Sequence, residues 1–252
     1  MGGPTVAVAV FACLISSAMV GVFAHTRLPS GTSTSRAVSM LRGGIGLIAV
    51  MAGIMLVLLT MTLKRDFDDA AANVRQFAAE VTELDHSLRR IGPQAAPARA
   101  LLFRFTARSM KDLWPATTPP LGPDDAQASR LFASLEDSLA ALRSPDPARR
   151  DLEVQARGEL HTMVAARWKV AERAGRSVSP WMLAILVFWL MLTFASAGFS
   201  VSRSPTTLTI LGLGALALAG AMFLVVEYAD PYEGVIVVSS EPVSNALFAL
   251  SD

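Results

Sequence analysis

The sequence predicts an all-α membrane protein, with four transmembrane helices and a helical hydrophilic domain, a coiled coil or helix bundle, between spans two and three. Three observations lead to this fold class. The 252 residues are 52% hydrophobic and only 17% charged, whereas soluble domains are about 25% charged. The segment between Lys64 and Arg176 holds 18 of the 22 Lys and Arg residues and 16 of the 21 Asp and Glu residues. Within that segment apolar residues recur three and four positions apart, the spacing of one helix face.

Four windows contain no charged residue and are long enough to cross a bilayer, whose hydrocarbon core of about 30 Å needs about 20 apolar helical residues. A charge at mid-helix costs about 2.5–3.5 kcal/mol on insertion, so this absence is informative. A soluble protein of this length would have to bury four such helices from all sides. The windows are residues 5–24, 43–63, 180–201 and 205–226.

These windows divide the chain into four parts. Residues 1–63 carry spans one and two, 64–179 form the hydrophilic helical domain, 180–227 carry spans three and four, and 228–252 form a C-terminal segment.

The first window has a second interpretation, a cleaved signal peptide, because Val22-Phe23-Ala24 resembles a small-residue cleavage site. The four residues that precede the window include no Lys or Arg, and the apolar run is longer than a usual signal core. We therefore expect a retained span.

Small residues share one helix face in three of the windows. Such faces let helices approach closely in lipid, where packing drives association. The favoured interpretation is packing within one subunit, and the alternative is an interface between copies of the chain. The three faces are Cys13, Ser17 and Gly21; Gly46, Ala49 and Gly53; and Gly212, Ala215 and Ala219.

The first two helices of the hydrophilic domain are defined by apolar stripes. Span two is predicted to continue without a break to Ile91, where Gly92-Pro93 supplies a C-terminal stop. A second helix is expected over residues 97–113. The stripes are Val74, Phe77, Val81, Leu84, Leu88 and Ile91 in the first helix and Leu101, Leu102 and Phe105 in the second.

Two further helices follow a proline-rich loop at residues 114–123. Asp124 or Asp125 is expected to cap the third helix, and residues 144–147 separate it from a fourth helix over 148–176. The third helix carries an apolar stripe formed by Leu131, Leu135, Leu139 and Leu142.

The C-terminal segment is expected to hold a turn, a short strand over Val235–Val238, and a short helix that starts at Ser240-Glu241-Pro242.

Positive charges give the expected orientation. In a four-span chain the termini and the hydrophilic domain lie on one side, where seven Lys and Arg residues flank the spans, against four on the other side. The positive-inside rule then favours a cytoplasmic domain in a multi-pass protein of the cell's inner (plasma) membrane. The seven are Lys64, Arg65, Arg75, Arg167, Lys169, Arg173 and Arg176, and the four are Arg27, Arg36, Arg42 and Arg203.

No pattern predicts catalysis, a cofactor or a metal site. His25, His86 and His161 have no metal-type spacing with one another or with Cys13, the single cysteine. There is no glycine-rich phosphate loop and no serine elbow. The net charge of +1 does not favour nucleic acid. The basic residues in 167–176 are interpreted as a solvated helix face, with anionic lipid headgroups as an alternative.

The stretch that follows span four is the first candidate functional motif. Its three carboxylates at a membrane edge would suit the vestibule of a cation pore; the alternative is an aromatic interfacial anchor followed by a turn. The motif consists of Glu227, Asp230, Pro231, Tyr232, Glu233, Gly234, Ser239 and Pro242.

A second candidate is Asp85, four residues before Arg89, with Arg99 and Trp114 further along. The default interpretation is an ion pair on a helix surface, worth a few tenths of a kcal/mol.

At these residues the chain resembles a bacterial family of membrane proteins called bestrophin-like, formerly a domain of unknown function. The resemblance runs from about residue 43 to 250 in two separated blocks. The first block is Phe67-Asp68, Leu84-Asp85, Leu88-Arg89-Arg90-Ile91-Gly92-Pro93, Arg99, Leu102 and Trp114-Pro115, and the second is Trp181, Phe188-Trp189, Gly198, Glu227, Pro231, Gly234, Ser239, Pro242 and Ala246-Leu247.

The resemblance implies four spans and a helical insert, and a distant similarity to the bestrophin anion channels. One departure is Asp230, which stands where the family pattern has a basic residue before the proline. An anion contact at that position is therefore not expected in this chain.

Two functions follow as hypotheses. The first is a non-enzymatic, homo-oligomeric ion channel or pore in the lipid bilayer, which passes an inorganic ion of unknown identity. The alternative is a membrane sensor or signalling scaffold, because two spans that flank four amphipathic helices also occur in receptor sensing bundles.

Overall fold

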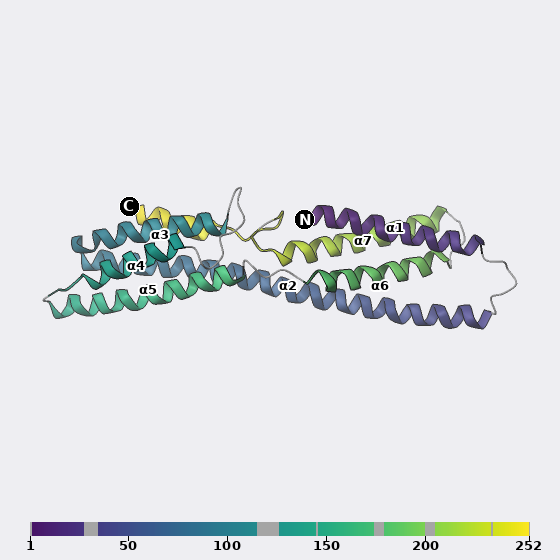
Figure 1. The fold of residues 1–252 in the computed structure, drawn as a ribbon, viewed down its shortest axis with the longest axis horizontal. Coiled ribbons are helices and arrows are strands. Elements are labelled where there is room, and N and C mark those ends of the chain that lie inside the picture. The colour runs from purple at the N-terminus through teal and green to yellow at the C-terminus, as the bar shows by residue number, and fades with distance from the viewer. Residues whose placement is uncertain are drawn as a thin grey trace. The chain divides into compact units, whose positions relative to one another are not determined.

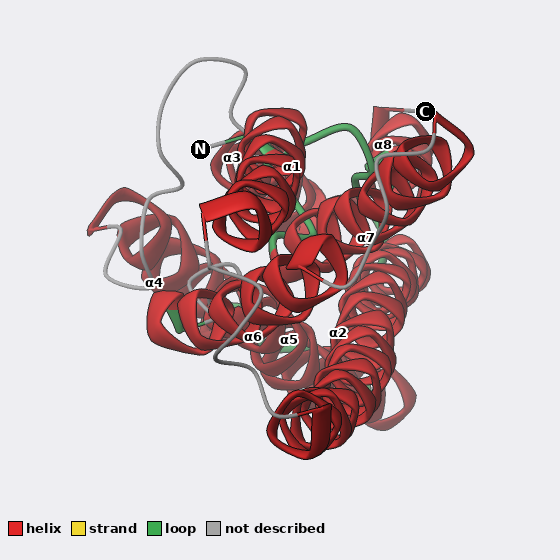
Figure 2. Ribbon diagram, turned by 90° about the vertical axis from the view of Figure 1, so that its right-hand side faces the viewer, coloured by secondary structure: helices red, strands yellow, loops and turns green. Residues whose placement is uncertain are grey.

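The computed structural model describes residues 2–27, 35–114, 126–144, 146–173, 179–199, 205–232 and 234–251. In those ranges the regular structure is helical and there is no strand (Figure 2). The helices are α1 (Gly3–Arg27), α2 (Ser35–Ile91), the 3-10 turn η1 (Pro93–Ala95), α3 (Ala96–Leu113), α4 (Ala126–Ala140), α5 (Pro147–Arg173), α6 (Pro180–Phe199), α7 (Pro205–Ala229) and α8 (Glu241–Ser251).

The chain forms two compact units. The first contains Met1–Asp66, Ser177–Ala229 and Gly234–Ile236, and the second contains Phe67–Arg176, Asp230–Glu233 and Val237–Asp252. Helix α2 contributes its first part to one unit and its second part to the other.

In the first unit α1, α6, α7 and the first part of α2 lie side by side (Figure 1). Four helices are long and apolar enough to cross a membrane, with mean hydropathies of 2.5, 2.5, 2.1 and 2.3 in chain order, which confirms the four predicted spans. Leu14, Leu186 and Met222 are fully buried between them. Leu47, Val57 and Leu213 are among the large apolar side chains left exposed on the outer faces, as expected for a surface that contacts lipid.

Helices α1 and α6 approach each other at the backbone. A Cβ at Gly198 would overlap the carbonyl oxygen of Ala18, and a Cβ at Gly21 would overlap that of Ala195. The Ser17 hydroxyl donates a hydrogen bond of 2.5 Å to the Met191 carbonyl across the same contact. Only glycine permits this separation, so Ser17 and Gly21 of the small face predicted on span one pack within the chain, whereas Cys13 of that face is exposed.

In the second unit the predicted apolar stripes form one core. Each residue of the first stripe is at most 1% exposed, and Leu102, Phe105, Leu135 and Leu139 are at most 2% exposed. Helix α3 packs against α4 and α8, and α4 packs against α5. The predicted stop of α2 is also confirmed, because Gly92 follows Ile91 with φ of 103°, which favours glycine.

Some sequence predictions differ from the structure. The strand expected at Val235–Val238 is wrong: these residues form bends and irregular backbone. The Val238 N–H donates a backbone hydrogen bond to the Pro231 carbonyl at 2.8 Å, and a single bond of this type does not form a β-ladder. The helix expected after Ser240 is confirmed as α8. Residues 115–125, which hold all but Trp114 of the loop predicted at 114–123 and the expected caps Asp124 and Asp125, lie outside the described residues.

The small faces of spans two and four behave differently from that of span one. Ala215 and Ala219 are buried at 0% and 3% exposure. A Cβ added at Gly46, Gly53 or Gly212 would meet nothing within 4 Å. These three glycines therefore leave open space next to their helices in a single chain.

Candidate functional site

Glu227, in the last turn of α7, turns its carboxylate into the protein. The residue is 2% exposed, and its Oε2 accepts hydrogen bonds from the backbone N–H of Val235 at 2.6 Å and of Ile236 at 2.9 Å. Hydrogen bonds to a charged acceptor are about twice as strong as neutral ones. The carboxylate therefore holds the backbone of Val235 and Ile236 against the end of α7.

Two glycines make room for this carboxylate. A Cβ at Gly234 would lie 2.6 Å from Oε2, and the residue has φ of 121°, which L side chains rarely adopt. A Cβ at Gly3 would overlap Oε1. We call Glu227, Gly3 and the backbone of 234–236 the Glu227 latch. It explains why a glycine stands at 234, which sequence reasoning assigned only to a turn.

Tyr232, from the same sequence motif, lies in the other unit and packs on the end of α3. Its ring is 5.8 Å from that of Trp114, centroid to centroid, in an edge-to-face arrangement of 82°. The Trp114 Nε1–H donates to the Val238 carbonyl at 2.9 Å. The buried Pro231 accepts the Val238 N–H, as described above. The aromatic pair thus fixes the segment that leads into α8.

The predicted acidic motif is therefore distributed among different roles. Glu227 is engaged by backbone amides, whereas Asp230 is exposed and its Oδ1 accepts the Tyr232 N–H at 3.4 Å. Glu233 lies outside the described residues. A cation vestibule at this edge stays a prediction, and in a single chain the Glu227 carboxylate is already satisfied.

The remaining motif residues start α8. The Ser239 hydroxyl accepts the Glu241 N–H at 3.2 Å, and the Ser240 carbonyl accepts the N–H groups of Val243 and Ser244. Pro242 occupies the first turn, where a missing N–H costs nothing. Their role in the described chain is helix initiation.

Span two and span four end in a cation–aromatic pair. The Lys64 ammonium lies 6.0 Å from the centre of the Tyr228 ring. Aromatic and basic residues are enriched at membrane interfaces, so this pair supports the interfacial-anchor interpretation of Tyr228.

The buried Asp85 forms an ion triad with two partly exposed arginines. Its side chain is 8% exposed, and its two oxygens lie 2.7 Å from the Nε atoms of Arg89 and Arg99. Each arginine then uses Nη2 to reach the C-terminal turn of α8, at the Ala249 carbonyl (2.6 Å) and the Leu250 carbonyl (3.4 Å). We call this arrangement the Asp85 clamp.

The predicted Asp85–Arg89 pair is confirmed; its Arg89 end lies on the helix surface as expected, whereas Asp85 is buried. Sequence spacing predicts the contact four residues apart and gives no sign that Arg99 joins from α3 or that α8 lies beyond. The clamp satisfies carbonyls that a helix leaves unpaired at its C-terminus, and the cations suit the negative end of the helix dipole.

A second buried polar group links α3 and α5. Arg167 is 8% exposed, donates from Nε to the Ser109 hydroxyl at 2.9 Å, and lies 3.6 Å from Asp112 Oδ2. Asp112 also lies 3.1 Å from the Arg108 Nε, and the Arg167 guanidinium is 5.5 Å from the Phe105 ring centre. The solvated helix face expected for Arg167 is therefore wrong.

Metal chemistry has no visible support in the part of the chain that the structure describes. No group of three or more His, Cys, Asp or Glu side chains there is arranged to hold an ion. Cys13 is a free thiol on the exposed side of α1.

Comparison with known proteins decides the family. A model described as Bestrophin-like domain matches residues 7–243. The chain belongs to the bestrophin-like family. The match starts inside α1, so the first span is part of the family domain; the resemblance is confirmed from residue 43 to 243 and extended towards the N-terminus to residue 7. No curated protein matches the chain.

Solved structures show the same fold. One variant of a bacterial bestrophin homologue from Klebsiella pneumoniae has a TM-score of 0.74 at 12% identity, with 96% of this chain and 97% of that chain covered. A second variant of that homologue has a TM-score of 0.71 at 13% identity, with coverages of 97% and 96%. A structure described as a membrane protein has a TM-score of 0.69 at 13% identity, with coverages of 95% and 94%.

Proposed function

We propose that this bestrophin-like protein is a homo-oligomeric channel for an inorganic ion in the bacterial inner membrane. Membership of the family is the observation that carries the proposal, because the family is related to the bestrophin channels. The charge-free spans support it, since they offer no acid–base group for catalysis within the bilayer.

A pathway along the spans would lie between copies. Among the described residues of the first unit the helices meet mainly through apolar side chains such as Leu14, Leu186 and Met222, each fully buried. The membrane span in α2 is the least buried of the four, because only 17% of its apolar stretch is buried within a single chain. Its open glycines, Gly46 and Gly53, would allow a helix from another copy to approach closely.

Liposome flux tests the proposed activity. Purified full-length protein in sealed liposomes is expected to release a trapped salt faster than protein-free liposomes, and replacement of the anion or of the cation in turn identifies the ion carried. Leak that stays at the protein-free level for every salt and pH tested would contradict the channel.

The hydrophilic domain is expected to face the cytoplasm, as the seven-to-four distribution of positive charge favours. A reporter that is active only in the cytoplasm, inserted near Pro120, is expected to be active. Activity of a periplasm-specific reporter at the same site would instead favour the sensor hypothesis, which requires the helical domain outside the cytoplasm.

A further inference from the structure

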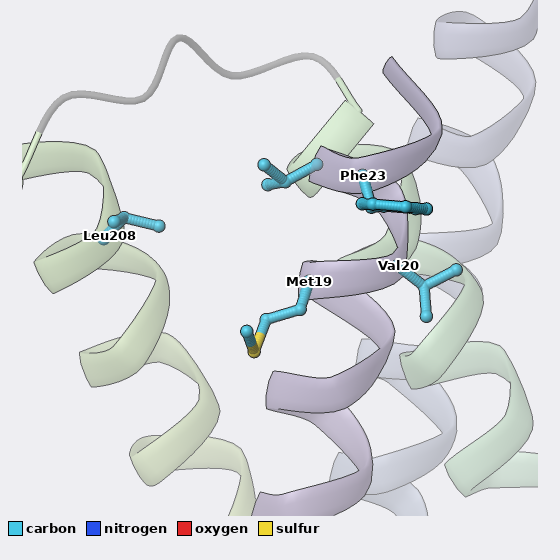
Figure 3. A pocket seen from close by; sticks show the side chains of 5 residues that line it. Met19, Val20, Phe23 and Leu208 are labelled. Atoms are coloured by element: carbon cyan, nitrogen blue, oxygen red, sulfur yellow. The ribbon is translucent and has the colours of Figure 1, made fainter. Parts of the chain in front are cut away.

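Helices α1 and α7 separate at one end of the first unit. They run antiparallel, and at one end the Gly3 backbone is pressed against the Glu227 carboxylate. At mid-length Leu14 and Ala215 are fully buried. Towards the other end Met19 on α1 and Leu208 on α7 face each other across an opening (Figure 3). The two helices thus enclose a wedge that is closed at Leu14 and open at Leu208.

On its opposite side α1 packs against α6. The backbone contacts at Gly21 and Gly198, and the hydrogen bond from Ser17 to Met191, hold this half of α1 against α6. The same half of α1 is thus in backbone contact with α6 and lines the wedge between α1 and α7.

The wedge is purely apolar and has the size of a ligand pocket. Its outer cavity, lined by Met19, Val22, Phe23 and Leu208 among others, has a volume of about 550 Å³. A second cavity of about 260 Å³ shares Met19, Val22 and Leu208 and extends to Leu211. Small-molecule pockets measure about 300–1,000 Å³, and the described residues that line the two cavities are all apolar.

We propose that this wedge is a binding site for one acyl chain of a membrane phospholipid. The wedge is continuous with the lipid-facing surface: Met19, Val20 and Phe23 on α1 are 66%, 66% and 56% exposed, and Leu208 is 52% exposed. Water would find no hydrogen-bond partner there. An empty wedge forfeits dispersion contacts along both helices, which a hydrocarbon chain restores.

The inference depends on the membrane location of the spans and not on ion conduction. In lipid the bound chain gains little hydrophobic free energy, because its surroundings are as apolar as the site. Its selectivity comes from shape. Met19 has a flexible thioether side chain that adapts to such a filler.

Photolabelling tests the site on the full chain in nanodiscs of phosphatidylcholine that carries a diazirine on one acyl chain. Labels are expected to concentrate on Met19, Val22 and Leu208 relative to Leu213 and Leu216, which are 61% and 60% exposed on the same helix α7 but line neither cavity. Even labelling of all these residues would overturn the proposal, as would a crosslink between two copies when a diazirine analogue of methionine replaces Met19.

A filled wedge provides the matched comparison. Leu208→Trp places a bulky ring in the opening and is expected to lower the yield of label on Met19 and Val22 about tenfold, equivalent to about 1.4 kcal/mol. The control Leu216→Trp leaves the yield unchanged. Met19→Trp with Val8→Trp as control repeats the test from α1 if the α7 variant fails to fold, with label then read on Leu208 and Leu211. Equal yields in filled and control variants would overturn the proposal.

Discussion

Replacing Glu227 with alanine is expected to lower the free energy of unfolding of the first unit by about 3 kcal/mol. The substitution leaves the Val235 and Ile236 amides without their carboxylate acceptor, and each hydrogen bond to a charged group contributes about 1.5–3 kcal/mol. Thermal unfolding in detergent, together with hydrogen exchange at these two amides, measures the effect.

Two further variants separate the hydrogen bonds from the bulk of the side chain. Both amides donate to the same oxygen, so Glu227→Gln can retain both contacts and is expected to lose about 1 kcal/mol, the difference between charged and neutral acceptors. Glu241→Ala, at an exposed carboxylate in the first turn of α8, is expected to cost at most about 1 kcal/mol. If Glu227→Ala is no more harmful than Glu241→Ala, the latch does not stabilise the protein.

Asp85→Ala is expected to destabilise the second unit by about 2–3 kcal/mol. The loss of a carboxylate that is buried between two arginines leaves their charges uncompensated, which costs about 3–5 kcal/mol when the site is fully buried. Arg89 and Arg99 have side chains that are 38% and 27% exposed, so water partly compensates for the lost partner and the expected loss is smaller.

The readout specific to the clamp is the last turn of α8. With Asp85 removed, the arginines lose their orientation towards the Ala249 and Leu250 carbonyls, and hydrogen exchange near the end of α8 is expected to rise more than at the buried stripe of α2. Glu83→Ala, at an exposed residue two positions earlier on α2, should change stability by no more than about 0.5 kcal/mol. Equal exchange in α8 for the two variants would contradict the clamp.

The membrane part of the fold follows from composition because lipid imposes a simple requirement. A spanning segment must be a helix of about 20 apolar residues, so the four charge-free windows determine their own structure. The apolar stripes of the helical domain can also be predicted from the sequence, because Val74, Phe77 and Leu84 recur with the period of one buried helix face. The predicted strand at Val235–Val238 failed because four β-branched or apolar residues fit a strand locally but have no partner strand to pair with.

The contacts of the candidate site were harder to predict from the sequence, because they join distant residues or involve the backbone. Glu227 is bonded by amides, which every residue carries, so no residue type signals the partner. Arg99 lies 14 positions after Asp85, beyond the break at Gly92, and the contact between the two depends on how α3 returns along α2. The buried Arg167 looks like any basic residue of a solvated helix until α3 supplies Ser109 and Asp112.

A structure of the purified full-length protein in lipid nanodiscs tests the central claim most directly. We expect a ring of identical copies around a central pathway, with the open face of α2 at Gly46 and Gly53 in contact with a neighbouring copy. A particle that contains a single chain, or several chains with no continuous passage between them, would contradict the proposal of an oligomeric channel.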